Sequence, residues 1–524
     1  MKAMTLIIVL SVSLLSFSGC QQERAPAEKQ TLRLNFAAEP PTLDHRKINY
    51  SIAANVLPML YDGLMRFDSA GNLVPSVAKS VEVSPDGRRY LFHLRRTSWS
   101  NGDPVTAYDF EFAWKWVLDP KNPAPLANHL YCLKNGKRAK EGRVPVSMVG
   151  VFARDSMTLI VELENPLPYF LELTSVYNFY PINHLRDPHS DEVIGNGPFT
   201  LKEWSPQREM TLERNPLYWD EEHVKLREVH ISFVQDANTE LQLFNKGKLD
   251  WAGAPVSSGL PFSSLSQLKS LQNQAFLGTY YYSINTQRPP FNNAKIRRAL
   301  SQAINREEIV EHITQGGESP AYRFVPPGAN FVTVNPQFTN EQIRQTFDEG
   351  LRELKLSREQ LRPITLTYNK SDMHHALAQT IQHCWKDVLG LNVQLKHRDW
   401  KAHLSEINVG NFDVARLTWK GLTSDPIHFL EIFQNPLHPM HRTGWYNPRY
   451  NQLIERATRS NQPNDRLFYL AAAEEILTDE MPVIPVFHLT ICYVKHPHLK
   501  GFVINQLGAI DYKWAYFDDD TISH

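Results

Sequence analysis

The 524-residue sequence is poor in cysteine, has fewer glycines than prolines, and carries almost no net charge. Four cysteines are too few for a chain of this length to depend on a disulfide framework. The 35 prolines against 24 glycines indicate rigid, ordered connections. A formal net charge of -1 provides no basic excess, which argues against nucleic-acid binding, and an aromatic content of 11% excludes disorder for most of the chain.

The common catalytic signatures are also missing. The sequence contains no G-x-S-x-G elbow, no G-x-x-x-x-G-K-[ST] loop, no H-E-x-x-H and no paired C-x-x-C. Gly195-Asn196-Gly197 lacks the third glycine of a dinucleotide fingerprint, and the histidines of the expected helix around His374 and His383 have no i,i+4 pair for a metal. We therefore expect no enzyme, cofactor or metal site, and a secreted hydrolase is the alternative from another class.

Long hydrophobic runs are absent apart from one near the start. Leu6 to Phe17 is apolar except for serines, and it is shorter than the roughly 20 residues that span a bilayer. It leads into Ser18-Gly19-Cys20, which resembles a bacterial lipoprotein signal that is cleaved before Cys20 and lipidated there. Residues 1–19 are then a signal peptide and residues 20–29 a tether. A plain signal peptide with a chance cysteine is the alternative.

This leader predicts a location outside the cytoplasm. We expect a soluble body on the periplasmic or cell-surface side of a bacterial membrane, attached through Cys20. Three cysteines remain in such a mature chain, Cys132, Cys384 and Cys492, and their disulfide state is left open.

Helix and strand patterns alternate along the rest of the chain. Thr106 followed by Asp109 predicts a capping box at a helix start, and the alternation after residue 280 indicates an α/β lobe, whereas residues 65–190 look richer in strands. The other expected helices cover 51–64, 238–246, 294–303, 374–389, 450–457 and 465–477. The expected strands cover 32–36, 90–94, 157–164, 199–201, 210–213, 229–233, 249–251, 280–285, 364–368, 393–396, 413–419 and 483–487.

The segment from Trp400 to Trp419 is the most informative. Its expected strand carries a lone Arg416 among apolar neighbours and ends in Trp419-Lys420-Gly421. Large aromatic residues at a strand end can wall a pocket, while the exposed edge of the strand pairs with an extended ligand. The alternative is that both tryptophans are core residues.

Several segments occur together in an order that resembles a known family. They are Leu57–Leu64, Trp99–Phe110, Asn215–Trp219, Gly247–Asp250, Asn285–Leu300 and Phe412–Arg416. The series resembles the extracytoplasmic solute-binding proteins of family 5, most closely the oligopeptide-binding proteins of ABC importers, over nearly the whole chain after the leader.

The resemblance implies an α/β fold of the periplasmic-binding-protein type II kind, with three lobes, a hinge and an interlobe cleft. Domain I would combine 30–64, 191–280 and 498–524, domain II would be 65–190, and domain III would be 281–497. The resemblance further implies a monomer that captures an extended peptide and delivers it to an ABC-type permease in the inner membrane.

The resemblance also implies the ligand-binding residues. Trp400, Arg416 and Trp419 match binding positions of the family, and main-chain groups near Ala38-Glu39 and Leu417–Lys420 would pair with the peptide backbone. The full expected set is Ala38, Glu39, Trp400, Arg416, Leu417, Thr418, Trp419, Lys420, Gly421 and Asp425.

Two positions depart from the family pattern. Leu422 stands where the peptide-binding members have an aspartate that pairs with the peptide α-amino group, and Ile407 stands where they have an arginine. Asp425 either substitutes for the missing carboxylate or caps the next helix. Recognition of a free amino end is therefore open. Murein-type or modified peptides, nickel complexes or haem are alternatives within the fold, and a structural surface lipoprotein that has lost transport is a third.

Overall fold

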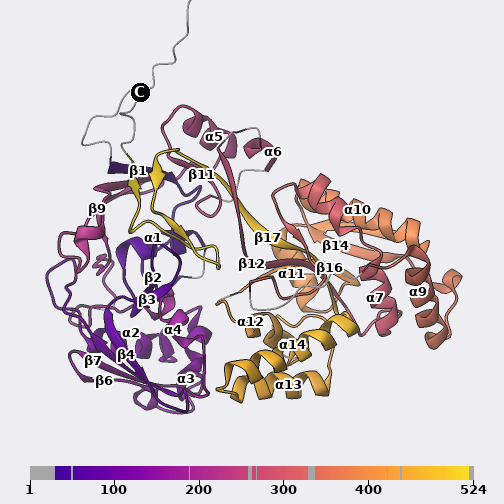
Figure 1. Cartoon of the computed structure of the whole chain (residues 1–524), viewed down its shortest axis with the longest axis horizontal. Coiled ribbons are helices and arrows are strands. Elements are labelled where there is room, and N and C mark those ends of the chain that lie inside the picture. Colours follow the sequence, from indigo (N-terminus) through magenta and orange to yellow (C-terminus); the bar gives the residue numbers. More distant parts are fainter. Residues whose placement is uncertain are drawn as a thin grey trace, which may run out of the picture.

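Two lobes, joined by two long strands, make up the molecule (Figure 1). The computed structural model describes residues 30–48, 51–187, 189–257, 262–266, 268, 270–328, 337–421, 423–436 and 440–518. The predicted signal peptide and tether, with Cys20, and the departure at Leu422 lie outside these residues.

The first lobe contains two four-stranded sheets. One has the order β1-β10-β9-β8, with β1 parallel to β10 and the other pairs antiparallel, and the second is an antiparallel sheet of order β4-β5-β7-β6. The strands of this lobe are β1 (Thr31–Asn35), β2 (Met65–Phe67), β3 (Leu73–Pro75), β4 (Ala78–Val83), β5 (Arg89–Leu94), β6 (Val151–Asp155), β7 (Thr158–Glu162), β8 (Phe199–Ser205), β9 (Glu209–Arg214), β10 (Glu228–Ser232) and β11 (Trp251–Gly253). Short C-terminal strands complete it: β18 (Leu499–Lys500), β19 (Val503–Ile504), β20 (Ile510–Asp511) and β21 (Tyr516–Phe517).

One helix of the first lobe begins where its capping signal predicts. The capping box predicted at Thr106 and Asp109 is confirmed at the start of α2. The helices are α1 (Ser51–Leu60), α2 (Ala107–Leu118), α3 (Gly136–Lys140), α4 (Phe170–Leu173), α5 (Ala237–Asn245) and α6 (Phe262–Leu265). One continuous hydrophobic core extends from Leu32 to Phe517 through both sheets of this lobe.

The helix expected over 51–64 ends at Leu60, because another segment meets its last turn. The Gly197 N–H donates to the Leu60 carbonyl at 2.9 Å, and a Cβ on Gly195 would lie 2.1 Å from that same oxygen. The Gly195-Asn196-Gly197 segment thus has a packing role, since only glycine permits this approach.

Two long strands connect the lobes. β12 (Leu271–Ile284) and β17 (Val483–Lys495) pair antiparallel, and the far end of β17 also pairs with β11 of the first lobe. Both are much longer than the strands expected at 280–285 and 483–487. A register shift between Ala275 and Thr279 interrupts the β12–β17 ladder between the two lobes.

The sheet of the second lobe has the order β11-β17-β12-β16-β14-β15 and lies between two layers of helices. Alternate residues of β12 enter different cores: Tyr280 and Tyr282 pack with α7, α9 and α10, whereas Tyr281 packs with α12, α13 and α14. The remaining strands are β13 (Ser319–Pro320), β14 (Ile364–Asn369), β15 (Val393–Arg398) and β16 (Val414–Lys420). The helices are α7 (Ala294–Gln302), α8 (Arg306–Glu308), α9 (Asn340–Leu354), α10 (Asp372–Leu389), α11 (Trp400–Asn408), α12 (Ile427–Leu430), α13 (Pro448–Arg459) and α14 (Pro463–Glu480).

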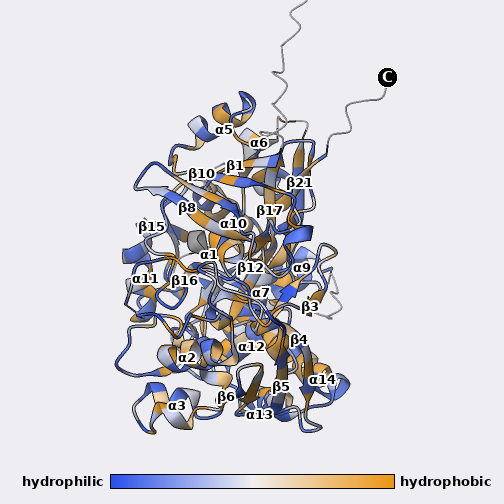
Figure 2. Cartoon of the chain, turned by 90° about the vertical axis from the view of Figure 1, so that its left-hand side faces the viewer, coloured by the Kyte–Doolittle hydropathy of each residue, from blue (hydrophilic) through white to orange (hydrophobic). Residues whose placement is uncertain are grey.

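Hydrophobic residues are distributed in short stretches over many elements, with hydrophilic residues between them (Figure 2). In the described part of the chain, no helix combines the length and the apolar character needed to cross a membrane. Cys132, Cys384 and Cys492 are free thiols.

Candidate functional site

One strand of the second lobe has an open edge. β16 pairs along its whole length with β12, whereas its parallel pairing with β14 stops at Thr367 and Ala415. From Arg416 onward, the edge of β16 that faces away from β12 pairs with no other strand in the described ranges. Such an edge presents main-chain donors and acceptors that an extended ligand can use.

The alternation of the strand identifies which groups face the open edge. Gly421 donates its N–H to β12, so the odd-numbered residues of β16 face that strand. The Arg416 carbonyl faces the other way and lies 2.9 Å from His403 Nε2. Thr418 and Lys420 therefore direct their N–H and C=O groups to the open edge, where the described residues provide them with no hydrogen-bond partner.

Arg416 is held beside this edge by neutral groups. Its guanidinium donates to Asn369 Oδ1 at 3.0 Å and to Thr418 Oγ1 at 2.6 Å, and it lies 4.6 Å from the ring centre of Tyr280. Its Nε is buried without a hydrogen-bond partner, and no carboxylate of the described residues pairs with it. The arrangement fixes a cation in place and leaves its charge for an anionic group.

Two histidines near Arg416 contribute no second cation. His374 Nδ1 lies 3.2 Å from the Tyr280 hydroxyl, and burial lowers the pKa of His374 to about 3. Burial also lowers the pKa of His403, so its neutral ring donates Nε2–H to the Arg416 carbonyl. Neither histidine therefore adds a positive charge to that of Arg416.

The two tryptophans expected at the site lie in different environments. Trp400 begins α11 and is 49% exposed, so it is not a core residue. Trp419 is partly buried against the α12–α14 layer, and its indole N–H donates to the His428 carbonyl at 2.7 Å. Contact of either ring with a ligand stays a prediction.

The turn after β16 needs a glycine at its first position. A Cβ on Gly421 would lie 2.9 Å from the Phe429 ring and 3.0 Å from the Thr423 carbonyl. The contact of Gly421 with Phe429 places the end of β16 against α12. Leu417, by contrast, has its side chain buried in the core and its main-chain groups turned to β12, so it presents nothing to the open edge.

Ala38 and Glu39 lie in the other lobe, just after β1. Glu39 accepts hydrogen bonds from Trp204 Nε1 at 2.6 Å and from the Gln207 N–H at 3.1 Å. Ala37 adopts a positive φ of 57°, which turns the chain sharply before the pair. No hydrogen bond or ion pair joins Ala38 or Glu39 to β16 in the described residues, so these predicted site segments lie in separate lobes (Figure 1).

Of the two roles predicted for Asp425, the structure shows the one at the start of the next helix. Its carboxylate pairs with the buried Arg466 at 2.8 Å and accepts the Ile427 N–H at the start of α12. The charge of Asp425 is matched by Arg466 in this structure, and its contact with a ligand amine stays a prediction.

Sequence reasoning missed a carboxylate from the first lobe. Glu172, on α4, accepts hydrogen bonds from the Ser424 N–H at 2.8 Å and the Ser424 hydroxyl at 2.7 Å. The two residues are far apart in sequence, and no local motif connects them. This contact joins the first lobe to the turn that follows β16.

Metal-binding side chains gather at one place in the described residues. Asp220, Glu222 and His223 bring potential ligand atoms within 4.8 Å of one another, on the surface of the first lobe. Asp220 already pairs with Lys513 at 2.6 Å and with His223 at 2.7 Å. These contacts explain the cluster as an ordinary surface ion-pair group.

Known proteins share this architecture. Residues 72–438 match the family described as bacterial extracellular solute-binding proteins, family 5 Middle. The chain is 36% identical over 534 residues to the oligopeptide-binding protein OppA of Bacillus subtilis (strain 168), with 98% of each chain covered. The unliganded open form of the periplasmic murein tripeptide-binding protein MppA superposes with a TM-score of 0.80 at 29% identity, covering 94% of this chain and 98% of that one. Haemophilus influenzae OppA in complex with RPPGFSPFR superposes with a TM-score of 0.76 at 28% identity, covering 94% and 99%.

These matches confirm the predicted family and the α/β fold of the type II periplasmic binding proteins. The members of this family are solute-binding proteins rather than enzymes. The relatives named above bind oligopeptides or a murein tripeptide. The chain belongs to family 5 of the bacterial extracellular solute-binding proteins.

Proposed function

We propose that this protein is a non-catalytic receptor that captures extended oligopeptides outside the cytoplasm and delivers them to an ABC-type permease. The observation that carries the proposal is the open edge of β16, where Thr418 and Lys420 present unpaired main-chain groups. Pairing with a peptide backbone supplies affinity without reading side chains, which suits a receptor for many sequences.

The charge beside the edge supports an orientation for the ligand. Arg416 has neutral partners only, so a peptide carboxylate can take the remaining charge of its guanidinium. A ligand with its carboxyl end at Arg416 runs antiparallel to β16. Its amino end then lies toward Lys420 and the turn into α12.

The remaining parts of the proposal concern organisation. We assign 30–64, 191–280 and 498–524 to domain I, 65–190 to domain II and 281–497 to domain III, with β12 and β17 as the hinge between domains I and III. Ala38 and Glu39 of domain I would approach the peptide from the opposite wall on closure. Lipidation at Cys20 would keep this monomeric receptor at the membrane surface.

Two substitutions of Thr418 test the main-chain pairing. Thr418→Pro removes the N–H that faces the open edge and leaves the β12 ladder intact, because only the odd-numbered residues of β16 turn their N–H and C=O groups to β12. Thr418→Val is the matched control, since it removes the hydroxyl that Arg416 contacts but keeps the N–H. We expect Thr418→Pro to weaken binding of pentaalanine at least tenfold in isothermal titration calorimetry, and Thr418→Val to weaken it less than threefold.

The outcome that would contradict the proposal is equal affinity in both variants and the unchanged protein. Native mass spectrometry of the purified protein, followed by denaturation, supplies an independent check. Release of peptides supports the proposal, whereas release of only metal complexes, haem or other non-peptide species would overturn it.

A further inference from the structure

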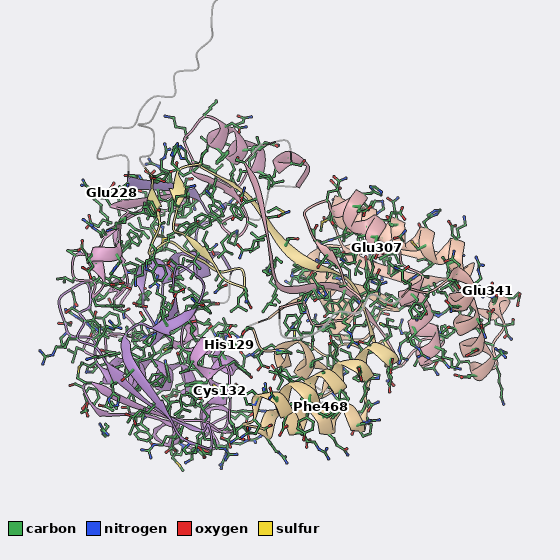
Figure 3. All side chains as sticks on the ribbon, viewed as in Figure 1. His129, Cys132, Glu228, Glu307, Glu341 and Phe468 are labelled. Carbon is green, nitrogen blue, oxygen red and sulfur yellow. The ribbon has the colours of Figure 1, made fainter. Side chains whose placement is uncertain are left out.

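The two lobes touch at a seam beside the end of β16. The seam is formed by the Glu172 carboxylate against Ser424, and by the Tyr169 ring, which lies edge-on to the His428 ring at 4.8 Å between centres. In Figure 3, His129 lies on the side of the first lobe that faces the second. The seam therefore combines a buried carboxylate with aromatic rings from both lobes.

Glu172 is buried without a fixed cation beside it. It is 9% exposed, and its hydrogen-bond donors are both neutral groups of Ser424. Burial raises the pKa of Glu172, and the two hydrogen bonds from Ser424 offset that only in part. A carboxylate in this situation gains more from an arriving cation than one already paired.

The charged groups around Glu172 are committed elsewhere. Asp425 and Arg466 form their own ion pair at 2.8 Å. His428 Nδ1 faces Glu431 at 3.2 Å, and His129 is held by Asn178 at 3.0 Å, with burial lowering the pKa of His129. In the described part of the chain, no lysine or arginine forms an ion pair with Glu172.

The seam lies where a peptide on the open edge would end. Ser424 follows the last residue of β16 by four positions, and Trp419 is tied through its indole N–H to the same His428 that faces Tyr169. From Arg416 to Lys420 the strand rises by about 13 Å, at roughly 3.3 Å per residue. A peptide of about five residues with its carboxylate at Arg416 therefore brings its amino end to the seam.

We propose that Glu172 receives the charged amino end of the bound peptide, so that the two lobes hold opposite ends of one ligand. This inference rests on the proposed peptide-binding function and names the group that recognises one terminus. The ammonium replaces or joins the neutral Ser424 donors at the Glu172 carboxylate and keeps its proton. Because Glu172 belongs to the first lobe and Arg416 to the second, the ligand then links the lobes and favours their closure.

The test compares pentaalanine with its N-acetylated form on three proteins by isothermal titration calorimetry. The unchanged protein is expected to bind the free-amine peptide at least tenfold more tightly than the acetylated one. Glu172→Gln is expected to bind both peptides equally, with an affinity for the acetylated peptide within threefold of the unchanged protein. Glu431→Gln, which alters an exposed carboxylate on the α12 side of the seam, is the matched control and is expected to keep the preference.

Three results would overturn the inference: an unchanged preference in Glu172→Gln, an equal loss of affinity for both peptides, and no preference in the unchanged protein. Failure of the unchanged protein to bind either peptide would instead contradict the proposed function itself, so the two failures are distinguishable.

A second measurement needs no variant and covers the case in which Glu172→Gln does not fold. Carbodiimide couples a carboxylate to an amine that is in contact with it. Treatment of the unchanged protein with pentaalanine present is expected to attach the peptide to Glu172, as identified by peptide mapping. Attachment at Asp425 or elsewhere, with Glu172 unmodified, would overturn the inference.

Discussion

Charged groups have different partners inside the first lobe and where the two lobes face each other. In the first lobe, Arg66 donates to both carboxylate oxygens of Asp511 at 2.7 Å and also faces Asp62 at 3.4 Å. Beside the open edge of β16 and at the seam, Arg416 and Glu172 have only neutral hydrogen-bond partners. The charge of Arg66 is paired with carboxylates of its own lobe, whereas Arg416 and Glu172 have no oppositely charged partner among the described residues.

The difference separates structural charges from those available to a ligand. Burial opposes the charge of Arg66, but Asp511 and Asp62 outweigh that effect and raise its pKa. These contacts join α1 and the strand after it to the C-terminal segment, so the ion pairs hold distant parts of the first lobe together. Arg416 has no carboxylate partner among the described residues, so an arriving anion can form a charge-assisted hydrogen bond with it.

The largest effect, a loss of stability, is expected when Arg66 is removed from its ion pairs with Asp62 and Asp511. Arg66→Met leaves the carboxylates of Asp62 and Asp511 without their cation in a buried setting, and we expect the free energy of unfolding to fall by about 3–5 kcal/mol. Urea unfolding followed by circular dichroism measures the change. Calorimetry below the transition should show peptide affinity unchanged in the folded protein.

The matched control is Arg208→Ala, which removes an exposed ion pair with Glu209 in the same lobe. We expect it to change the unfolding free energy by less than about 0.5 kcal/mol. A similarly small change for Arg66→Met would show that the buried group is not a structural one.

A smaller effect, on binding affinity and not on stability, is expected when Arg416 is replaced. Arg416→Met removes a charge-assisted contact to the ligand carboxylate, which corresponds to about 1.5–3 kcal/mol of binding free energy. We expect affinity for pentaalanine to fall by that amount, while the unfolding free energy changes by less than about 1 kcal/mol. C-terminally amidated pentaalanine should be affected much less.

Arg398→Met serves as the control, because Arg398 pairs with Glu406 on the surface of the same lobe. It should leave both binding and stability nearly unchanged. If Arg416→Met instead destabilised the protein and left affinity intact, the two regions would not differ in the way described.

Local signals were enough to predict most elements. The capping box at Thr106 and Asp109, the alternation that marks β5, and the helical periods of α7 and α10 depend on neighbours in sequence, and the structure has them where they are expected. Arg416 could be singled out because a lone charge in an apolar strand is unusual.

Features that depend on distant segments could not be predicted in this way. The first half of β12 is largely exposed between the lobes, so it lacks the alternation that reveals a half-buried strand. The helix α11 was not predicted, because it buries only His403 and Ile407 and so shows little apolar periodicity. Glu172 gives no sign of its position, because its partner Ser424 belongs to the other lobe.

Amide hydrogen exchange at β16, resolved by residue with NMR, tests the central claim most directly. In the free protein the Trp419 N–H is bonded to β12, whereas the N–H groups of Thr418 and Lys420 face the open edge. On addition of pentaalanine, the account predicts strong protection at Thr418 and Lys420 and little change at Trp419. Exchange at Thr418 and Lys420 that stays as fast in the bound protein as in the free protein would contradict it.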